Sequence, residues 1–285
     1  GAEGMLGHVC LIKLSEKFQV LATTKNKRNI IFDNLNFLND SVILENVDLT
    51  NFEKIEKIIK KFKPKYLVNC AGVINKKISN YSKANSIKIN SLLPHILSNL
   101  SELYKFRFLH ISTDCVFDGS KGDYYEYDKK NAVDFYGQTK SIGEEFSNKR
   151  SIILRTSIIG HEIKSKLGMM EWFLNSKKKV EGYAAFRYSG ITTLEIQRFI
   201  IYFLNQKKMS GLYNLASTTI TKYKLLKIIN NVYNKKIIIL KNRYVKKNMV
   251  LKSNKLKLSN KNKPQSWQKQ IEDLKKFYEK NYKKV

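Results

Sequence analysis

Apolar runs alternate with helical patterns along the first part of the chain. Short runs typical of buried strands lie at 18–24, 42–51, 63–72, 106–113 and 151–160. Apolar residues recur at helical spacing at about 5–17, 52–62, 86–104 and in the stretch that holds Tyr136 and Lys140. Strands that alternate with helices predict βαβ units in a parallel sheet with helices on both faces. We therefore expect residues 1–160 to form a doubly wound Rossmann domain of the α/β class, with Thr50 as the N-cap of the helix at 52–62.

The pattern loosens after residue 160. Helices are expected at 167–176 and 194–206, strand-like segments at 186–193 and 211–217, and a lysine-rich segment covers 220–285. We expect residues 161–285 to form a smaller substrate-binding region. Elements around 190–210 are expected to rejoin the Rossmann domain.

A glycine motif opens the sequence, with Gly1, Gly4 and Gly7 ahead of a helical pattern. Glycines let the backbone approach a pyrophosphate closely, and a helix start offers unpaired N–H groups. Together with Met5 and Leu6, these residues are the expected pyrophosphate loop of a dinucleotide site. Because such a loop normally follows a strand, we expect about six to ten residues of a first strand to precede Gly1.

Residues at the ends of the next strands complete the expected cofactor site. An acidic residue after the strand at 18–24 would favour NAD, but the chain has Lys25 and Arg28, which suit the 2′-phosphate of NADP. Ligands of open α/β sheets lie at the carboxyl ends of the strands. The residues at those ends are Asp48, Leu49, Cys70, Ala71 and Gly72. We expect NADPH as the cofactor, with NADH as the alternative.

Tyr136 and Lys140 stand four residues apart on the same expected helix and so share one face. A phenol has an ordinary pKa of about 10, and a nearby ammonium lowers it. Thr113, at the end of the strand 106–113, is placed to hold a substrate carbonyl beside that phenol. The three residues suit proton delivery to an alkoxide formed by hydride attack.

Composition narrows the partners and the compartment. The net charge of +29 allows a nucleic-acid binder, but basic residues recur on almost every element, which favours biased composition. We expect no nucleic-acid partner, and the field should attract an anionic substrate such as a sugar nucleotide. Three cysteines without a CxxC pair indicate reduced thiols and a cytoplasmic location. The sequence has no apolar run of about 18 residues, so we expect no membrane span. It has no metal-ligand spacing, so we expect no metal site.

The motifs taken in order resemble the extended short-chain dehydrogenase/reductases, and most closely their dTDP-4-dehydrorhamnose reductase branch. They are GAEGMLG, DLT, LVNCAG, HISTDCVFDG, YGQTKSIGE, LRTSIIG and SGITTLE. The resemblance implies NADPH-dependent reduction of the 4-keto group of a dTDP- or UDP-linked 6-deoxyhexose, for a surface polysaccharide. It also implies that Thr113, Tyr136 and Lys140 are catalytic, and that Tyr136 and Lys140 also bind the cofactor. Asn90 would support Lys140 through water.

The sequence defines the sugar site less fully than the cofactor site. The resemblance places Asp114 at the sugar, with Ser112 as a neighbouring hydroxyl, and Cys115 where the family often has tyrosine, which leaves the exact sugar open. Trp172 offers a stacking face, and either Arg187 or Arg155 could bind the diphosphate.

Two alternative functions stay open at this point. A cysteine and a histidine beside the same trio, here Cys115 and His161, would suit a 3,5-epimerase/4-reductase. The other alternative is a non-catalytic NADP-binding regulatory subunit. Formation of a homodimer is also left open.

Overall fold

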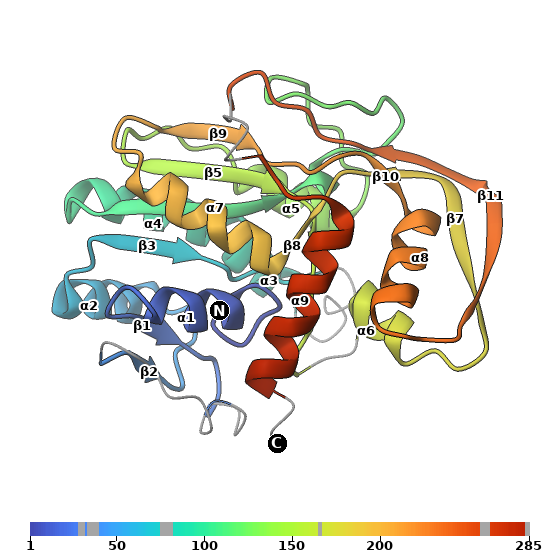
Figure 1. Ribbon diagram of the computed structural model, residues 1–285. Coiled ribbons are helices and arrows are strands. Elements are labelled where there is room, and N and C mark those ends of the chain that lie inside the picture. Colours follow the sequence, from blue (N-terminus) through green and yellow to red (C-terminus); the bar gives the residue numbers. More distant parts are fainter. Residues whose placement is uncertain (28–31, 33–39, 75–81, 165–166, 257–262, 283–285) are drawn as a thin grey trace.

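The computed structural model describes residues 1–27, 32, 40–74, 82–164, 167–256 and 263–282 (Figure 1). Its main sheet has four parallel strands in the order β3 (Tyr66–Asn69), β4 (Arg107–Thr113), β5 (Ser151–Thr156) and β9 (Gly211–Asn214). A second parallel pair is formed by β1 (Leu21–Thr23) and β2 (Val42–Leu44). Because these strands run in parallel, their carboxyl ends meet at one edge.

Helices cover both faces of the main sheet. Leu109 and Ile111 of β4 pack with α1 (Gly7–Ser15) and α7 (Thr193–Asn205). Phe108, one position along, packs with α2 (Phe52–Phe62) and α4 (Leu93–Leu103). Successive side chains of a strand point to opposite faces, so an almost continuous apolar run in β4 requires cover on both sides. The predicted α/β class is confirmed.

A second group of elements lies beside the main sheet (Figure 1). In its sheet, β7 (Lys179–Tyr188) lies between β10 (Ile220–Thr221), which is antiparallel to it, and β11 (Ile238–Met249), which is parallel. The helices α6 (Met169–Leu174), α8 (Lys222–Val232) and α9 (Trp267–Tyr282) contribute to one apolar cluster with this sheet. A short parallel pair, β6 (Ile158–Ile159) and β8 (Ile191–Thr192), stands between the groups.

Two local expectations differ from the structure. The helix expected at 86–104 is divided into α3 (Lys83–Ile87), a π-helical turn η3 (Lys88–Leu92) and α4. Pro94 has no N–H to donate to the carbonyl of the residue four positions earlier, which favours the wider turn there. The N-cap of α2 is Asn51, which accepts a hydrogen bond from the Lys54 N–H at 2.9 Å, and not Thr50.

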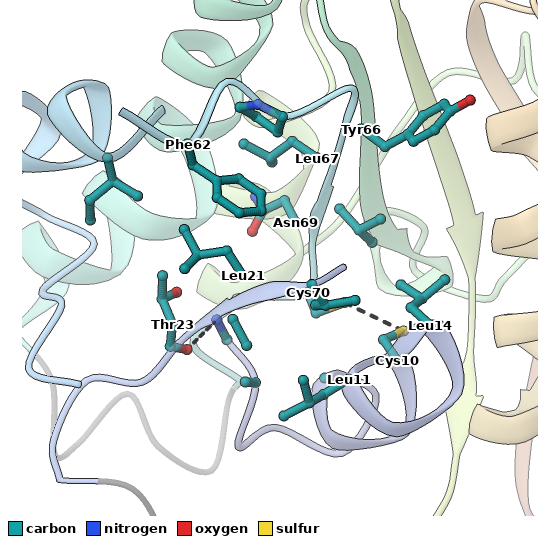
Figure 2. A pocket seen from close by; sticks show the side chains of 18 of the residues that line it. Cys10, Leu11, Leu14, Leu21, Thr23, Phe62, Tyr66, Leu67, Asn69 and Cys70 are labelled. Atoms are coloured by element: carbon teal, nitrogen blue, oxygen red, sulfur yellow. Dashed lines mark hydrogen bonds between the residues drawn. The ribbon is translucent and has the colours of Figure 1, made fainter. Parts of the chain in front are cut away.

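An apolar slot separates β1 from β3 (Figure 2). It has a volume of about 630 Å³ and is lined by Leu11 and Leu14 of α1, Leu21 of β1 and Leu67 of β3, among others. Among the described strands, β1 pairs only with β2 and β3 only with β4, so both edges that face the slot have backbone groups outside any ladder. The additional strand expected before the glycine loop would lie between these edges, and it stays a prediction.

Candidate functional site

The glycine loop packs against itself and against the end of β3. The Gly4 N–H donates to the Gly1 carbonyl at 3.1 Å. A Cβ added to Gly7 would lie 2.0 Å from the same carbonyl oxygen, and one added to Gly1 would lie 2.9 Å from the Ala71 nitrogen. These approaches leave no room for a side chain, so the loop requires glycine at both positions.

His8 fixes the loop from the first turn of α1. Its ring is buried, and burial lowers the pKa of His8 to about 4, so the imidazole is neutral at neutral pH. The ring Nδ1 lies 2.9 Å from the Gly4 carbonyl oxygen, which fits an Nδ1–H donor. The Leu6 side chain is buried in the core beside β4, so of this expected cofactor residue only the backbone is available to a ligand.

A pocket of about 280 Å³ opens beside the loop. The expected cofactor residues that line it are Gly1, Gly4, Met5, Lys25, Asp48, Leu49, Cys70, Ala71 and Gly72. Arg28 lies outside the described residues. The other lining residues are Ala2, Glu3, Thr23, Thr24, Asn26, Val47, Val73, Ile89, Glu162 and Lys164. The last two follow β6 and are distant in sequence, and an ion pair between Lys164 and Glu3 joins them to the loop.

Asp48 is held in a defined orientation at the rim of this pocket. Its Oδ1 accepts hydrogen bonds from the Thr50 N–H and hydroxyl, each at 2.9 Å. The bond from the Thr50 N–H is the main cause that lowers the pKa of Asp48, and Lys25 and Lys88 lower it further. The carboxylate is therefore ionised at neutral pH and available as an acceptor.

The turn after β4 brings Thr113 and Tyr136 together. Gly137 follows Tyr136 on α5 (Phe135–Ile142), and a Cβ on Gly137 would lie 2.1 Å from the Cys115 carbonyl oxygen. This close contact seats the start of α5 directly on the turn. Burial raises the pKa of Tyr136, and the neighbouring Thr113 hydroxyl acts in the opposite direction. The phenol is thus protonated at neutral pH.

The pKa of Tyr136 is raised and not lowered as the sequence suggested, and Lys140 forms its hydrogen bonds with β4. Its Nζ donates to the Ile111 carbonyl at 2.8 Å and lies 3.2 Å from His110 Nε2, so the ammonium is bonded to β4. Burial is the main cause of the raised pKa of Tyr136. Burial also lowers the pKa of Lys140 itself, to about 8. The two side chains share a helix, but in this structure Lys140 is fixed by the strand.

Asn90 links the strand ends to α5. Its Oδ1 accepts the Val73 N–H at 2.8 Å, and its Nδ2 donates to the Val73 carbonyl at 2.9 Å and to Thr139 Oγ1 at 3.1 Å. A buried amide with three partners positions the helix that carries Tyr136 and Lys140. The π-helical turn holds this side chain, in line with the frequent occurrence of such turns at functional sites.

Asp114 and Cys115 extend the site beyond Thr113. Asp114 is buried, and its Oδ1 accepts from the Thr113 hydroxyl at 3.2 Å and from Cys115 Sγ at 3.6 Å. Burial raises the pKa of Asp114 and also that of the Cys115 thiol, to about 12. Ser112 is buried too, and its hydroxyl has no hydrogen-bond partner among the described residues.

The other substrate candidates are more exposed or already engaged. Trp172 on α6 is 44% exposed, and Arg187 on β7 lies 4.0 Å from Asp123 in an ion pair. Arg155 is buried and bonds both oxygens of Glu144, at 3.1 and 2.7 Å. Arg155 therefore holds the core together and is not available for a diphosphate.

The pair proposed for epimerase chemistry lacks a free base. His161 Nδ1 lies 2.6 Å from Glu171 Oε1, and its Nε2 lies 2.7 Å from the Tyr233 hydroxyl. Both ring nitrogens are therefore engaged. With the pKa of Cys115 raised to about 12, neither side chain favours proton abstraction from a sugar carbon.

The fold and this set of residues define a Rossmann-type α/β protein with a glycine-loop pocket and a threonine–tyrosine–lysine group at one edge of its sheet. Within that class, the chain belongs to the family described as RmlD substrate binding domain, whose model matches residues 1–279. The predicted resemblance is thereby confirmed.

Similar proteins agree with this assignment. The chain is 33% identical over 115 residues to a dTDP-4-dehydrorhamnose reductase of Aggregatibacter actinomycetemcomitans, covering 39% of each chain. It is 26% identical over 163 residues to a probable low-salt glycan biosynthesis reductase, Agl14, of Haloferax volcanii, covering 56% of this chain and 52% of that one. The chain thus matches about half or less of the length of these curated relatives.

Solved structures share the whole fold. A dTDP-4-dehydrorhamnose reductase of Bacillus anthracis in complex with NADP superposes with a TM-score of 0.74 at 19% identity, covering 90% of this chain and 98% of that one. Of the helices that the structure describes, none combines the length and the apolar composition that crossing a membrane requires.

Proposed function

We propose that this protein reduces the 4-keto group of a nucleotide-linked 6-deoxyhexose with NADPH. The observation that carries the proposal is the placement of the Tyr136 phenol beside the Thr113 hydroxyl, at the end of β4. The glycine loop stands at the end of the neighbouring strand β3. The names of the relatives, which include a dTDP-4-dehydrorhamnose reductase and a glycan biosynthesis reductase, support the same activity.

The residues around the loop fit a dinucleotide. Gly1 and Gly7 let the loop fold closely on itself and on the end of β3, and the start of α1 offers N–H groups to a pyrophosphate. Lys25 borders the same pocket and suits a 2′-phosphate, while Asp48 would accept from the adenine amino group. The bound nicotinamide would supply the hydride. Solved neighbours of the same fold hold NADP or NAD, which supports a nicotinamide cofactor, and Lys25 is the feature that favours NADPH.

The chain's own residues would handle the proton. The Thr113 hydroxyl would donate to the C4 carbonyl oxygen and hold it beside Tyr136. The Tyr136 phenol is protonated at neutral pH, and an alkoxide is basic enough to take its proton although burial raises the phenol's pKa. Lys140 would bind the nicotinamide ribose and stabilise the phenolate that remains after proton transfer, with Asn90 in support.

The sugar would lie over the turn after β4. Asp114, with Ser112 and Cys115 beside it, borders that position, Trp172 would stack on the base or sugar, and Arg187 would leave Asp123 to bind the diphosphate. We propose a cytoplasmic enzyme whose product enters a surface polysaccharide, acting as a monomer or a homodimer.

The test follows NADPH absorbance with a panel of dTDP- and UDP-linked 4-keto-6-deoxy sugars. Tyr136→Phe is expected to lower kcat by about 100-fold or more, because the general acid is lost. NADPH binding, followed by its fluorescence, should be retained. Tyr127→Phe serves as the matched control, since Tyr127 is 71% exposed.

Two outcomes would contradict the proposal. Equal turnover by Tyr136→Phe and the wild type would remove the proton-donor role. Binding of NADPH without turnover of any sugar in the panel would instead favour the non-catalytic subunit.

A further inference from the structure

Three buried polar side chains, Asn69, His110 and Lys140, form a continuous line that ends at a proposed catalytic residue. The parallel pairing of β3 and β4 puts Asn69 in register with His110. Asn69 Nδ2 lies 3.2 Å from His110 Nδ1, and His110 Nε2 lies 3.2 Å from Lys140 Nζ. These three residues, which we call the buried triad, join the end of β3 to the helix α5.

The backbone fixes the direction of the first hydrogen bond in the buried triad. Asn69 Oδ1 lies 3.0 Å from the Ala71 nitrogen and accepts its N–H. A backbone N–H is only a donor, so the oxygen of the amide must face it and the NH₂ group must face His110. The Asn69 amide therefore donates to His110 Nδ1, and that ring nitrogen must be the acceptor.

This donor sets the tautomer of His110. Burial lowers the pKa of His110 well below its ordinary value, so the ring is neutral and carries one proton. Because Nδ1 is the acceptor, that proton is on Nε2, the nitrogen that faces Lys140. Lys140 thus meets an N–H group across 3.2 Å. An amine can accept a hydrogen bond from this group through its lone pair, whereas an ammonium has no acceptor site.

We propose that Asn69 and His110 are positioning residues that act through Lys140, by presenting a donor to it and so favouring its uncharged form. The Ile111 carbonyl oxygen, 2.8 Å from Nζ, accepts an N–H of either form and keeps the side chain in place. The buried triad therefore fixes the lysine on β4 and also weakens its hold on the proton. The pKa of Lys140, which burial lowers to about 8, has the same direction.

Other titratable groups act on the buried triad from the elements packed around it. Glu144 on α5 and then Cys70 after β3 raise the pKa of Lys140, in opposition to burial. Lys140 and then His95 of α4 add to burial in lowering the pKa of His110. A test of the proposal must leave these groups unchanged and alter only the direction of the hydrogen bonds.

The inference rests on the proposed function only in its effect on turnover. In that function the Lys140 ammonium stabilises the Tyr136 phenolate, so activity is lost as the pH rises and Lys140 gives up its proton. The buried triad would then set the alkaline limit of the reaction, in the region of pH 8. The tautomer of His110 and the titration of Lys140 can be measured without any sugar.

The first measurement is ¹⁵N NMR of the wild-type protein at neutral pH. The chain has four histidines, and the ring signals of His110 are identified by their loss in His110→Phe. The account predicts a proton on Nε2 and none on Nδ1, read from the two-bond couplings of the ring. A proton on Nδ1, alone or together with one on Nε2, would overturn the inference.

The second measurement reverses the hydrogen bonds with Asn69→Asp. The carboxylate still accepts the Ala71 N–H and also accepts from His110 Nδ1, so Nε2 becomes an acceptor for the lysine ammonium. The titration of Lys140, identified by its loss in Lys140→Met, should move up by about one pH unit or more. The alkaline limit of kcat/KM should move up with it. Asn205→Asp, at an exposed position at the end of α7, is the matched control and should move neither.

A His110→Phe background separates the hydrogen bonds from the added charge. A phenylalanine ring can pack beside Phe108 and Phe146 as His110 does, but it has no nitrogen to transmit the change. Asn69→Asp should then raise the Lys140 titration by less than about half as much as it does with His110 present. An equal rise in both backgrounds, or no rise with His110 present, would overturn the inference. A wild type that reduces no sugar nucleotide would remove the proposed function and leave the NMR result standing.

Discussion

At the scale of single residues, the site combines a protonated phenol with a lysine whose pKa is lowered by burial toward neutral pH. Tyr136 has a raised pKa, and the pKa of Lys140 is lowered to about 8. The lysine is bonded to the Ile111 carbonyl and adjoins His110. Because burial lowers the pKa of His110 well below its ordinary value, that ring is neutral and adds no second charge beside the lysine.

Lys140 should make the free energy of unfolding depend on pH, in a direction that its pKa defines. Its pKa is about 8 when folded and about 10.4 when unfolded, so between these values the unfolded chain binds more protons and stability rises with pH. We expect urea unfolding to show wild type gaining about 1.5 kcal/mol relative to Lys140→Met between pH 8 and pH 9.5. A difference between the two proteins that does not change with pH would contradict the buried ammonium.

The sequence indicated the candidate catalytic residues better than it indicated the contacts that these residues make. Spacing alone placed Tyr136 and Lys140 on one helix face, and the end of an apolar run located Thr113. It could not show that Lys140 would bond to a carbonyl of β4, because that contact depends on how α5 is seated on the strand.

At the scale of elements, two strand edges that face an apolar slot are the main unusual feature. The slot lies between β1 and β3, and Gly1 lies at its border, where its amino group is 3.3 Å from the Thr23 carbonyl oxygen (Figure 2). Strand edges with free N–H and C=O groups pair readily with an extended segment. The volume of about 630 Å³ and the apolar lining suit alternating valine and isoleucine side chains.

We expect this slot to accept an added strand. Fusing about six residues rich in valine and isoleucine in front of Gly1 should raise Tm by about 5 °C or more, because both edges gain hydrogen bonds and apolar surface is buried. A glycine–serine segment of the same length is the control. Equal Tm values for the two fusions would show that the slot does not take a strand.

Elements with strong apolar patterns were predicted well, and others were not. The range of α2 matches the expected helix at 52–62, since its apolar residues face the core at regular spacing. In contrast, β11 was not recognised, because most of its lysine-rich positions are exposed and carry no apolar alternation. Its position is fixed by pairing with β7, which is a long-range contact that no local pattern reveals.

At the scale of the whole molecule, the net charge of +29 is the dominant property. Such a field attracts anions over about a Debye length and is screened by salt. A sugar nucleotide carries a diphosphate, so the proposed substrate is of the matching sign.

The charge leads to a kinetic prediction. Raising the salt concentration from about 20 mM to 500 mM should increase KM for the sugar nucleotide by about fivefold or more, with kcat within about twofold, because encounter is weakened but the chemistry is not. Sodium and potassium chloride should give the same result at equal ionic strength. A KM that does not respond to salt would show that the field does not guide this substrate.

The central claim is that the protein transfers a hydride from NADPH to C4 of a sugar whose oxygen is protonated by Tyr136. The most direct measurement uses NADPH deuterated at C4 of the nicotinamide, a 4-keto-6-deoxy sugar nucleotide and mass spectrometry with NMR of the product. The account predicts one deuterium at C4 of the sugar, formed by the wild type and strongly reduced in Tyr136→Phe. A product without deuterium at C4, or deuterium transfer unaffected by Tyr136→Phe, would contradict it.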